Sequence, residues 1–98
     1  MSKIEELILE WANTRGLIEG TTPTKQALKL QEEVGELAAA VLRYNHKDTI
    51  DAIGDCFVVL VNLSASLGTT LEACAEAAYD EIKGRTGQMV NGTYVKDE

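Results

Sequence analysis

Two short acidic segments stand inside stretches that otherwise have the sequence of buried helices. Residues 32–36 are Glu-Glu-Val-Gly-Glu, and residues 51–55 are Asp-Ala-Ile-Gly-Asp. A carboxylate that faces a helical core needs a cation nearby, because an isolated buried charge is strongly disfavoured. Too few lysines and arginines lie near these segments to neutralise all five carboxylates. A divalent metal ion, held by carboxylate oxygens, is therefore the leading explanation.

The three glutamates of the first segment share one side of a helix. A helix advances about 100° per residue, so Glu32, Glu33 and Glu36 fall within roughly 100° of arc beside the apolar side. Like charges one turn apart, such as Glu32 and Glu36, cost about 0.2–0.5 kcal/mol. Lys25 and Lys29 project near the same arc and would offset that repulsion. A solvated acidic face is the alternative interpretation of this segment.

The second segment is harder to explain as a solvated face. Asp51 and Asp55 lie one turn apart on a stripe that Asn62 continues. Asp55 directly precedes the apolar run 56–61, so we expect its carboxylate to be shielded from water. The alternatives to a metal are a buried salt bridge or a raised pKa. Two facing helices that both offer carboxylates suit Mg²⁺, with Mn²⁺ as a substitute.

Other catalytic designs fit the sequence poorly. A di-iron or di-manganese bundle needs a Glu-x-x-His pair on each of two helices, whereas His46 is the single histidine and is expected in a loop. One histidine also disfavours Ser-His-Asp and Cys-His sets, and no Walker-type glycine loop is present. Cys56 and Cys74 lack metal-ligand spacing and indicate reduced core thiols, with a disulfide as the alternative.

Four helices are expected to position these residues, at about residues 2–14, 22–44, 48–67 and 69–83. Ser2 with Glu5, and Thr69 with Glu72, have the spacing of capping boxes. Thr22 precedes a proline, which is typical of a helix start. The expected apolar face of the second helix consists of Ala27, Leu30, Val34, Leu37, Ala38 and Val41.

The third helix has an apolar centre and a polar start. We expect it to begin at Asp48, with Asp51 available to complete a cap, and to end before Gly68. Its centre, residues 56–61, is apolar on every side and taken alone would also suit a buried strand. The length and the helical neighbours favour a helix. Burial all round then implies contact with a second subunit.

The C-terminal tail has the sequence of a tight β-hairpin. Asn91-Gly92 stands between short apolar pairs in residues 89–95, and a hairpin this short is expected to pack against the helices. The fold class expected is all-α. It is a four-helix, bundle-type subunit completed by dimerisation, with residues 1–98 as a single domain and a short hairpin at the end.

Composition limits the partners. The chain has 98 residues, 45% of them apolar, and a net charge of −7. Such a charge repels nucleic acid and anionic membranes, so neither is an expected partner. The first residues lack the pattern of a signal peptide, and no continuous apolar run is long enough to span a bilayer. A soluble, cytoplasmic protein is expected.

Residues 29–38, Lys-Leu-Gln-Glu-Glu-Val-Gly-Glu-Leu-Ala, resemble the E-E-x-x-E segment of the MazG-like nucleotide pyrophosphohydrolases. Gly54-Asp55 resembles the end of that family's second motif, E-x-x-D. The resemblance extends to Trp11 and to the closing segment 83–92. It implies an all-α dimer or dimer of dimers. It also implies Mg²⁺-dependent hydrolysis of a nucleoside triphosphate to a monophosphate and pyrophosphate.

The resemblance also implies roles for single residues. Glu33, Glu36 and Asp55 would bind the metal, and Glu32 would bind a second ion or orient the site. The family's E-x-x-D would place glutamate at position 52, where this chain has Ala52. Asp51 would then reach the metal from a different angle, and thinner coordination would put activity or metal affinity in question.

The chemistry of phosphate-anhydride hydrolysis agrees with these residue types. A metal lowers the pKa of its bound water, and Glu32 or Glu33 would accept the proton of that water.

Four further side chains are candidates for substrate binding: Trp11, Lys29, Lys83 and Arg85. Trp11 would stack on a base, with a core position as the alternative. Lys83 and Arg85 would hold phosphates, with complementation of a helix C-terminus as the alternative. The competing hypothesis for the whole chain is a non-catalytic helical oligomer that binds cations or nucleotides without turnover.

Overall fold

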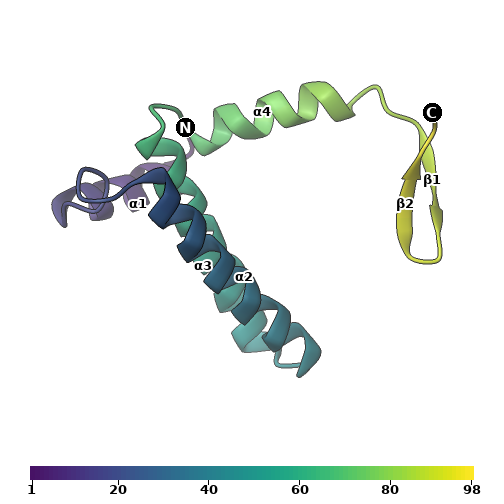
Figure 1. The fold of residues 1–98 in the computed structure, drawn as a ribbon, viewed down its shortest axis with the longest axis horizontal. Helices are drawn as coiled ribbons and strands as arrows, with labels where there is room; N and C mark the ends of the chain where they lie inside the picture. Colours follow the sequence, from purple (N-terminus) through teal and green to yellow (C-terminus); the bar gives the residue numbers. More distant parts are fainter.

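The computed structural model describes all 98 residues and shows four helices and one two-stranded hairpin (Figure 1). The elements, in chain order, are α1 (Lys3–Thr14), α2 (Pro23–Leu42), α3 (His46–Ser66), α4 (Leu71–Ile82), β1 (Gly87–Val90) and β2 (Thr93–Lys96). The predicted four-helix subunit with a C-terminal hairpin is confirmed. The single domain and the dimer stay predictions.

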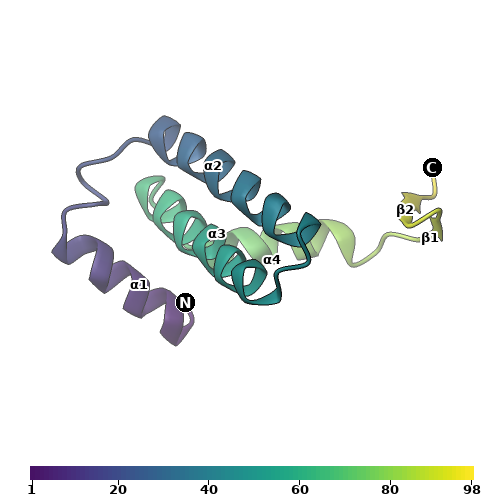
Figure 2. The ribbon, with the colours of Figure 1, turned by 90° about the horizontal axis from the view of Figure 1, so that it is seen from below.

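Helix α3 is the centre of the subunit. It packs along α2 on one side and beside α1 on the other (Figure 2). A short turn joins α2 to α3, with Tyr44 in the left-handed region at φ 56°. The buried apolar residues are few and small: Ala12, Ala40, Ala52, Val59 and Val61. Large apolar side chains lie half-exposed on every helix, so one copy of the chain does not complete a core.

Two of the predicted helix starts are confirmed. The Ser2 hydroxyl accepts a hydrogen bond from the Glu5 backbone N–H, and the Ser2 backbone N–H donates to the Glu5 carboxylate, which completes a capping box. At the start of α2, Thr22 accepts from the backbone N–H of Lys25, and Pro23 is the first helical residue.

The other two predicted starts are wrong by one or two residues. Asn45 caps α3 by accepting from the Asp48 N–H at 3.0 Å, so His46 is the first helical residue and does not lie in a loop. Thr70, not Thr69, caps α4 by accepting from the Ala73 N–H at 3.0 Å. Asparagine and threonine are both strong N-caps, and two adjacent threonines left the choice open to sequence reasoning.

The predicted apolar face of α2 is only partly covered in one chain. Leu30 and Leu37 are half-buried, whereas Val34 and Val41 on the same face are 44% and 51% exposed. The centre of α3 is likewise covered only in part. Val59 and Val61 are buried, but the apolar residues between and before them are only half-buried. Burial all round is therefore absent from the single chain.

The chain beyond α3 forms an arm that leaves the other helices. Helix α4 diverges from α3, and the hairpin stands at its far end (Figure 1). Asn91 and Gly92 have φ values of 50° and 82°, as a type I′ turn requires, so the hairpin itself is confirmed. Every hairpin residue is exposed. The prediction that it packs against the helices is wrong for a single chain, because α4 carries it away from them.

By length and composition alone, α3 is the one helix that would cross a membrane, with a mean hydropathy of 1.4. The value is a mean over 18 residues of the helix, so polar residues within it do not prevent this result although the continuous apolar run is short. The same helix carries Asp51 and Asp55, and core helices of soluble proteins pass the same test.

Candidate metal and nucleotide site

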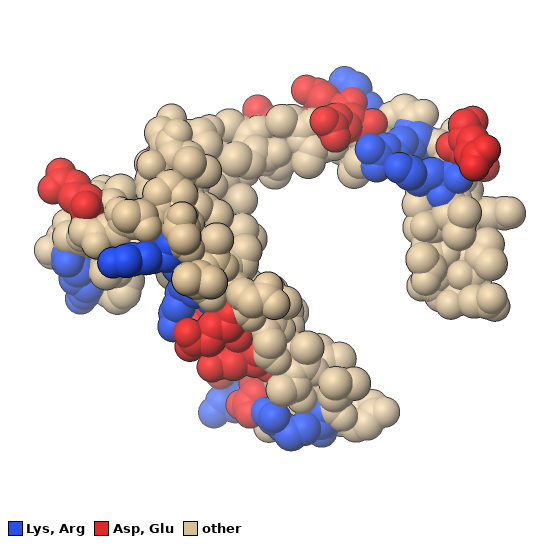
Figure 3. Space-filling view, viewed as in Figure 1, with Lys and Arg blue, Asp and Glu red and all other residues tan.

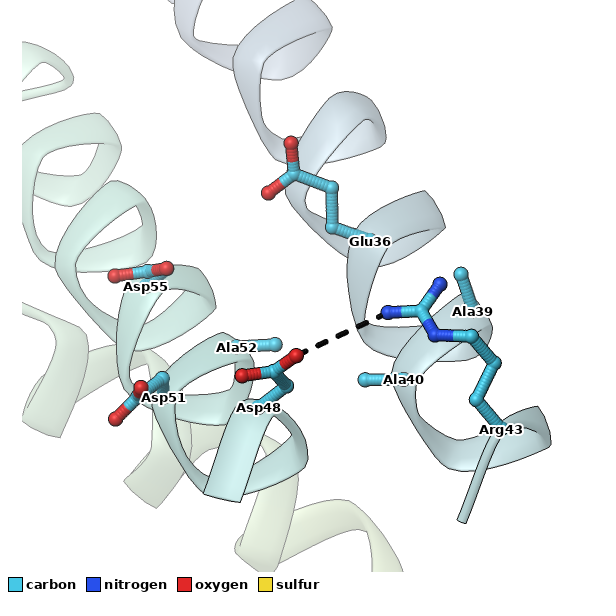
Figure 4. Close-up of a pocket in the computed structure, with 8 residues that line it drawn as sticks. All are labelled: Glu36, Ala39, Ala40, Arg43, Asp48, Asp51, Ala52 and Asp55. Carbon is cyan, nitrogen blue, oxygen red and sulfur yellow. Dashed lines mark ion pairs between the residues drawn. The ribbon is translucent and has the colours of Figure 1, made fainter. Parts of the chain in front are cut away.

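A pocket of about 310 Å³ lies between α2 and the first half of α3. Its lining residues are Glu36, Ala39, Ala40, Arg43, Asp48, Asp51, Ala52 and Asp55 (Figure 4). Two acidic segments that lie far apart in sequence thus contribute to one cavity, as the sequence predicts. Two small buried residues, Ala40 on α2 and Ala52 on α3, line the pocket from facing helices (Figure 4).

Glu36 and Asp55 line this pocket from facing helices. Neither carboxylate forms an ion pair with a lysine or arginine of the chain. Figure 4 shows Asp51 on the same helix as Asp55 but with its carboxylate directed away from Glu36. No three acidic, histidine or cysteine side chains are already gathered at metal-ligand spacing. A metal here requires rotation of these exposed side chains, a fast motion at a protein surface.

Glu33 is the one buried carboxylate of the two predicted clusters. It is 8% exposed, and its Oε1 lies 3.3 Å from Nζ of Lys29. Its Oε2 is buried and has no hydrogen-bond partner. A buried acceptor without a donor is costly, which makes this oxygen a candidate ligand for a cation.

The charge of Glu33 acts directly on Glu36. Repulsion from the charge of Glu33 is the largest cause that raises the pKa of Glu36 above its ordinary value. Glu32 adds to the repulsion and Lys29 opposes it. Repulsion between neighbouring carboxylates is typical of cation-binding sites, because a bound cation would reduce that repulsion.

Cys56 lies on α3 beside both acidic clusters. Burial raises the pKa of its thiol, and the charges of Glu33 and Asp55 add to this effect. Glu33 and Asp55 therefore act on one side chain from two helices. Cys56 and Cys74 are both free thiols, as predicted, but the prediction that they are core residues is wrong, because Cys56 is half-buried and Cys74 is exposed.

The prediction that Asp55 is shielded from water is wrong, because its side chain is exposed. Asp55 lines three cavities. Besides the acidic pocket, Asp55 lines a cavity of about 370 Å³ with Leu7, Ile8, Trp11 and Val58. The apolar run that follows Asp55 is covered by α1 only in part, which leaves the carboxylate at an open edge.

Trp11 lines this second cavity and is not a core residue. Its side chain is 47% exposed, and the Arg15 guanidinium stacks on its ring at 4.5 Å from the ring centre. Trp11 and the acidic pocket are connected through Asp55, which lines both cavities. An apolar cavity beside an acidic one suits a ligand with a flat base and a charged chain.

The remaining predicted binding residues lie elsewhere or are already engaged. Lys29 contacts Glu32 and Glu33 at 3.3 Å each, and these contacts raise the pKa of Lys29. Glu32 is exposed beside it. Lys83 and Arg85 follow α4, far along the arm from the pocket (Figure 1). The structure does not bring them to the acidic residues of the same chain.

Arg43 and Asp48 line the pocket but were missed by sequence reasoning. The Arg43 guanidinium lies 4.0 Å from the Asp48 carboxylate, a long contact between two exposed side chains (Figure 4). The sequence spacing of Arg43 and Asp48 could have indicated that they belong to the site. Arg43 follows Glu36 by seven residues, and Asp48 precedes Asp55 by seven, so each pair shares a helix face.

Ala52 occupies the place that a second-motif glutamate would have. It is 6% exposed and lines the pocket opposite α2. A glutamate there would point into the cavity, whereas the alanine methyl group offers no ligand. Asp51, one residue earlier, faces a different direction because a helix turns about 100° per residue.

Comparison with known proteins places the chain in a family. The MazG nucleotide pyrophosphohydrolase domain matches residues 21–90. The chain is also similar to an uncharacterized 18.2 kDa protein of the rep-hol intergenic region of Haemophilus phage HP1, with 48% identity over 68 residues. That match covers 65% of this chain and 41% of the phage protein, so this chain spans less than half of its relative. No solved structure matches. On the domain match, the chain belongs to the MazG nucleotide pyrophosphohydrolase family.

Proposed function

We propose that this chain is a Mg²⁺-dependent nucleoside triphosphate pyrophosphohydrolase. It would convert a ribo- or deoxynucleoside triphosphate and water to the monophosphate and pyrophosphate, and so remove aberrant or surplus nucleotides in the cytoplasm. Family membership supports the reaction class. The poorly covered apolar faces of α2 and α3 support a homodimer or homotetramer.

The observation that carries this proposal is the environment of Glu33. Its buried Oε2 has no partner, Glu36 beside it has a raised pKa, and Asp55 acts on the same thiol as Glu33. Two of these carboxylates, Glu36 and Asp55, line one pocket, and the third, Glu33, lies beside Glu36 with one lysine, Lys29, as its partner. Mg²⁺ fits this all-oxygen donor set and tolerates water as its remaining ligands.

In this proposal Glu33, Glu36 and Asp55 hold the metal, and Mn²⁺ would substitute. The bound metal would neutralise phosphate charge and make a bound water acidic. Glu32, exposed and adjacent to the site, accepts the proton of the attacking water; Glu33 takes this role if it is not a ligand. Asp51 would join the metal only after its side chain rotates toward α2.

Arg43 is the cation of the pocket that is best placed for phosphate. Its contact with Asp48 is long and both side chains are exposed, so the guanidinium is free to turn toward an anion. A guanidinium binds phosphate oxygens with two parallel hydrogen bonds, and it would hold the pyrophosphate that leaves. The base would stack on the face of Trp11 that Arg15 does not cover.

The test is a panel of ribo- and deoxynucleoside triphosphates, incubated with the protein and Mg²⁺ and separated by chromatography. Monophosphate and pyrophosphate in equal amounts, with no inorganic phosphate, are expected. The Glu36→Gln protein is the control for contaminating hydrolases. If no triphosphate is consumed by well-folded wild-type protein, the proposal fails.

A non-catalytic nucleotide-binding module is the second candidate. It is favoured by Ala52, which leaves the second motif incomplete, and by the absence of three pre-gathered ligands. Calorimetry separates the two candidates. Binding of a triphosphate with Mg²⁺ and no heat of turnover would favour the module, whereas continuous heat release that stops when substrate is exhausted would favour the enzyme.

A further inference from the structure

Asn62 on α3 carries the one buried side-chain amide of the chain, and the oxygen of this amide has no partner. The residue is 6% exposed, and its Oδ1 is buried without a hydrogen-bond donor. Ser64, a buried polar residue one position beyond the next, is satisfied, because its hydroxyl donates to the Leu60 carbonyl at 2.8 Å. A buried acceptor that lacks a donor lowers stability. Asn62 therefore calls for a donor that the chain does not supply.

Helical spacing places Asn62 on the side of α3 that lines the Trp11 cavity. Asp55 and Val58 line that cavity from α3, and Trp11 lines it from α1. At about 100° per residue, the direction of Asn62 on the helix falls between those of Asp55 and Val58. Asn62 follows Val58 after a rise of about 6 Å, which is one further turn of the helix. The amide therefore lies beside the cavity, at its edge toward the end of α3.

Distance and charge separate Asn62 from the acidic pocket. Asn62 does not line that pocket, and the helix rises about 10 Å from Asp55 to Asn62. Residues 56–71 include no charged residue. Figure 3 accordingly shows the upper end of the helix pair, where α3 meets α4, as uncharged on this face. A neutral hydrogen-bond donor is therefore a better partner for the Asn62 oxygen than a metal ion, for which carboxylates are the preferred ligands.

A nucleobase in the Trp11 cavity would bring a neutral donor of this kind. The cavity has a volume of about 370 Å³, and the Trp11 ring offers a flat face for stacking. The outer edge of a stacked base would extend toward the next turn of α3. Cytosine and adenine donate from an amino group at that edge, whereas thymine and guanine present a carbonyl oxygen there. A carbonyl oxygen opposite Oδ1 of Asn62 would leave two buried acceptors without a donor.

We propose that Asn62 selects nucleotides whose base carries an amino group at this edge, namely those of cytosine and adenine. Its Oδ1 accepts a hydrogen bond from the amino group while the base stacks on Trp11. Asp55 lines both the acidic pocket and the Trp11 cavity, so it lies between the phosphate end and the base end of the ligand. This selection rests on the proposed nucleotide site, and it does not require that the nucleotide be hydrolysed.

Binding of matched nucleotides tests this selection without turnover. Calorimetry with Mg²⁺ compares non-hydrolysable triphosphate analogues of deoxycytidine with deoxyuridine, and of deoxyadenosine with deoxyinosine. Each pair contrasts an amino group with a carbonyl oxygen at the same position. In at least one pair the amino base should bind about tenfold or more tightly than its counterpart. Equal binding in both pairs, tighter binding of the carbonyl bases, or no binding of any analogue overturns the selection. A preference for amino bases in protein that hydrolyses no triphosphate supports it, and only the proposed function then fails.

Asn62→Leu tests whether the amide makes the choice. Leucine has a similar size and no acceptor, so the variant should lose about tenfold in affinity for the amino base and bind both members of a pair about equally. Its melting temperature should not fall, because an unsatisfied buried oxygen is removed. Asn62→Ala gives the same comparison with a smaller side chain. Ser64→Ala, which removes a buried polar group that has its own partner, is the matched control and should keep the wild-type preference. An unchanged preference in both Asn62 variants, or an equal loss of affinity for both members of each pair, overturns the proposal.

Discussion

Nζ of Lys29 lies 3.3 Å from Oε1 of Glu33, and this contact leaves Oε2 of the same carboxylate buried and without a partner. Lys29 is shared with Glu32, so one ammonium serves two carboxylates, and Glu36 beside them has none. The charge balance of this part of α2 is therefore incomplete in the protein alone. A cation at the pocket would complete it, which links the stability of the helix pair to ligand binding.

Removing one ligand should abolish turnover and preserve the fold. We expect Glu36→Gln and Asp55→Asn each to lower kcat/KM by about 100-fold or more, because even groups that only support metal ligands cost 10–100-fold. The metal-free Glu36→Gln protein should melt no lower than wild type, since repulsion from Glu33 is removed. Activity assays and thermal melts check this. Glu19→Gln is the control, and loss of fold in Glu36→Gln would mean that Glu36 has a structural role.

Restoring the missing motif residue should strengthen the site. Ala52→Glu places a carboxylate into the pocket where Ala52 now faces α2. We expect roughly tenfold tighter Mg²⁺ binding, measured by calorimetry, together with a lower melting temperature when Mg²⁺ is absent. Ala52→Gln is the matched control because it has the same size and no charge. Equal Mg²⁺ affinity in both variants would show that position 52 does not face the metal.

The raised pKa of Glu36 predicts how the metal-free protein depends on pH. Because the folded state holds this proton more tightly than the unfolded state, stability should fall as pH rises through the pKa of Glu36 in the folded protein. Glu33→Gln removes the largest cause and should lower that pKa toward its ordinary value. Carboxyl NMR titration of both proteins measures this directly. An unchanged Glu36 titration in Glu33→Gln would show that the two carboxylates do not interact.

The start of α4 offers a test of the fold itself. Thr70→Ala removes the cap and should lower the free energy of unfolding by about 1 kcal/mol, whereas Thr69→Ala should change it much less. Urea denaturation measures both. A larger loss for Thr69→Ala would favour the capping box that the sequence predicts over the observed cap.

The helices and the hairpin could be predicted from the sequence because their signals are local. Caps such as Ser2 and Thr22, the proline at position 23 and the Asn91-Gly92 turn act over three or four residues. The errors arose where two local signals compete, as with Thr69 and Thr70. They also arose where the answer depends on a partner, as with the exposed hairpin.

Helical periodicity in the sequence predicted which carboxylates face each other, but it did not predict the rest of the site. Opposed carboxylates on α2 and α3 follow from periodicity, and the pocket brings Glu36 and Asp55 together. The exposure of Asp55, the outward direction of Asp51 and the roles of Arg43 and Asp48 depend on how far α1 covers α3 and on where α2 ends. Those features come from tertiary packing, which periodicity does not specify.

Binding of Mn²⁺, followed by the loss of the free-ion electron paramagnetic resonance signal, tests the central claim most directly. Wild-type protein with a non-hydrolysable triphosphate analogue should bind Mn²⁺, and Mg²⁺ should displace it. Glu36→Gln and Asp55→Asn should each weaken this binding by about tenfold or more, and Glu19→Gln should leave it unchanged. If wild type binds no Mn²⁺, or if both pocket variants bind it as wild type does, the carboxylates of α2 and α3 do not form a metal site.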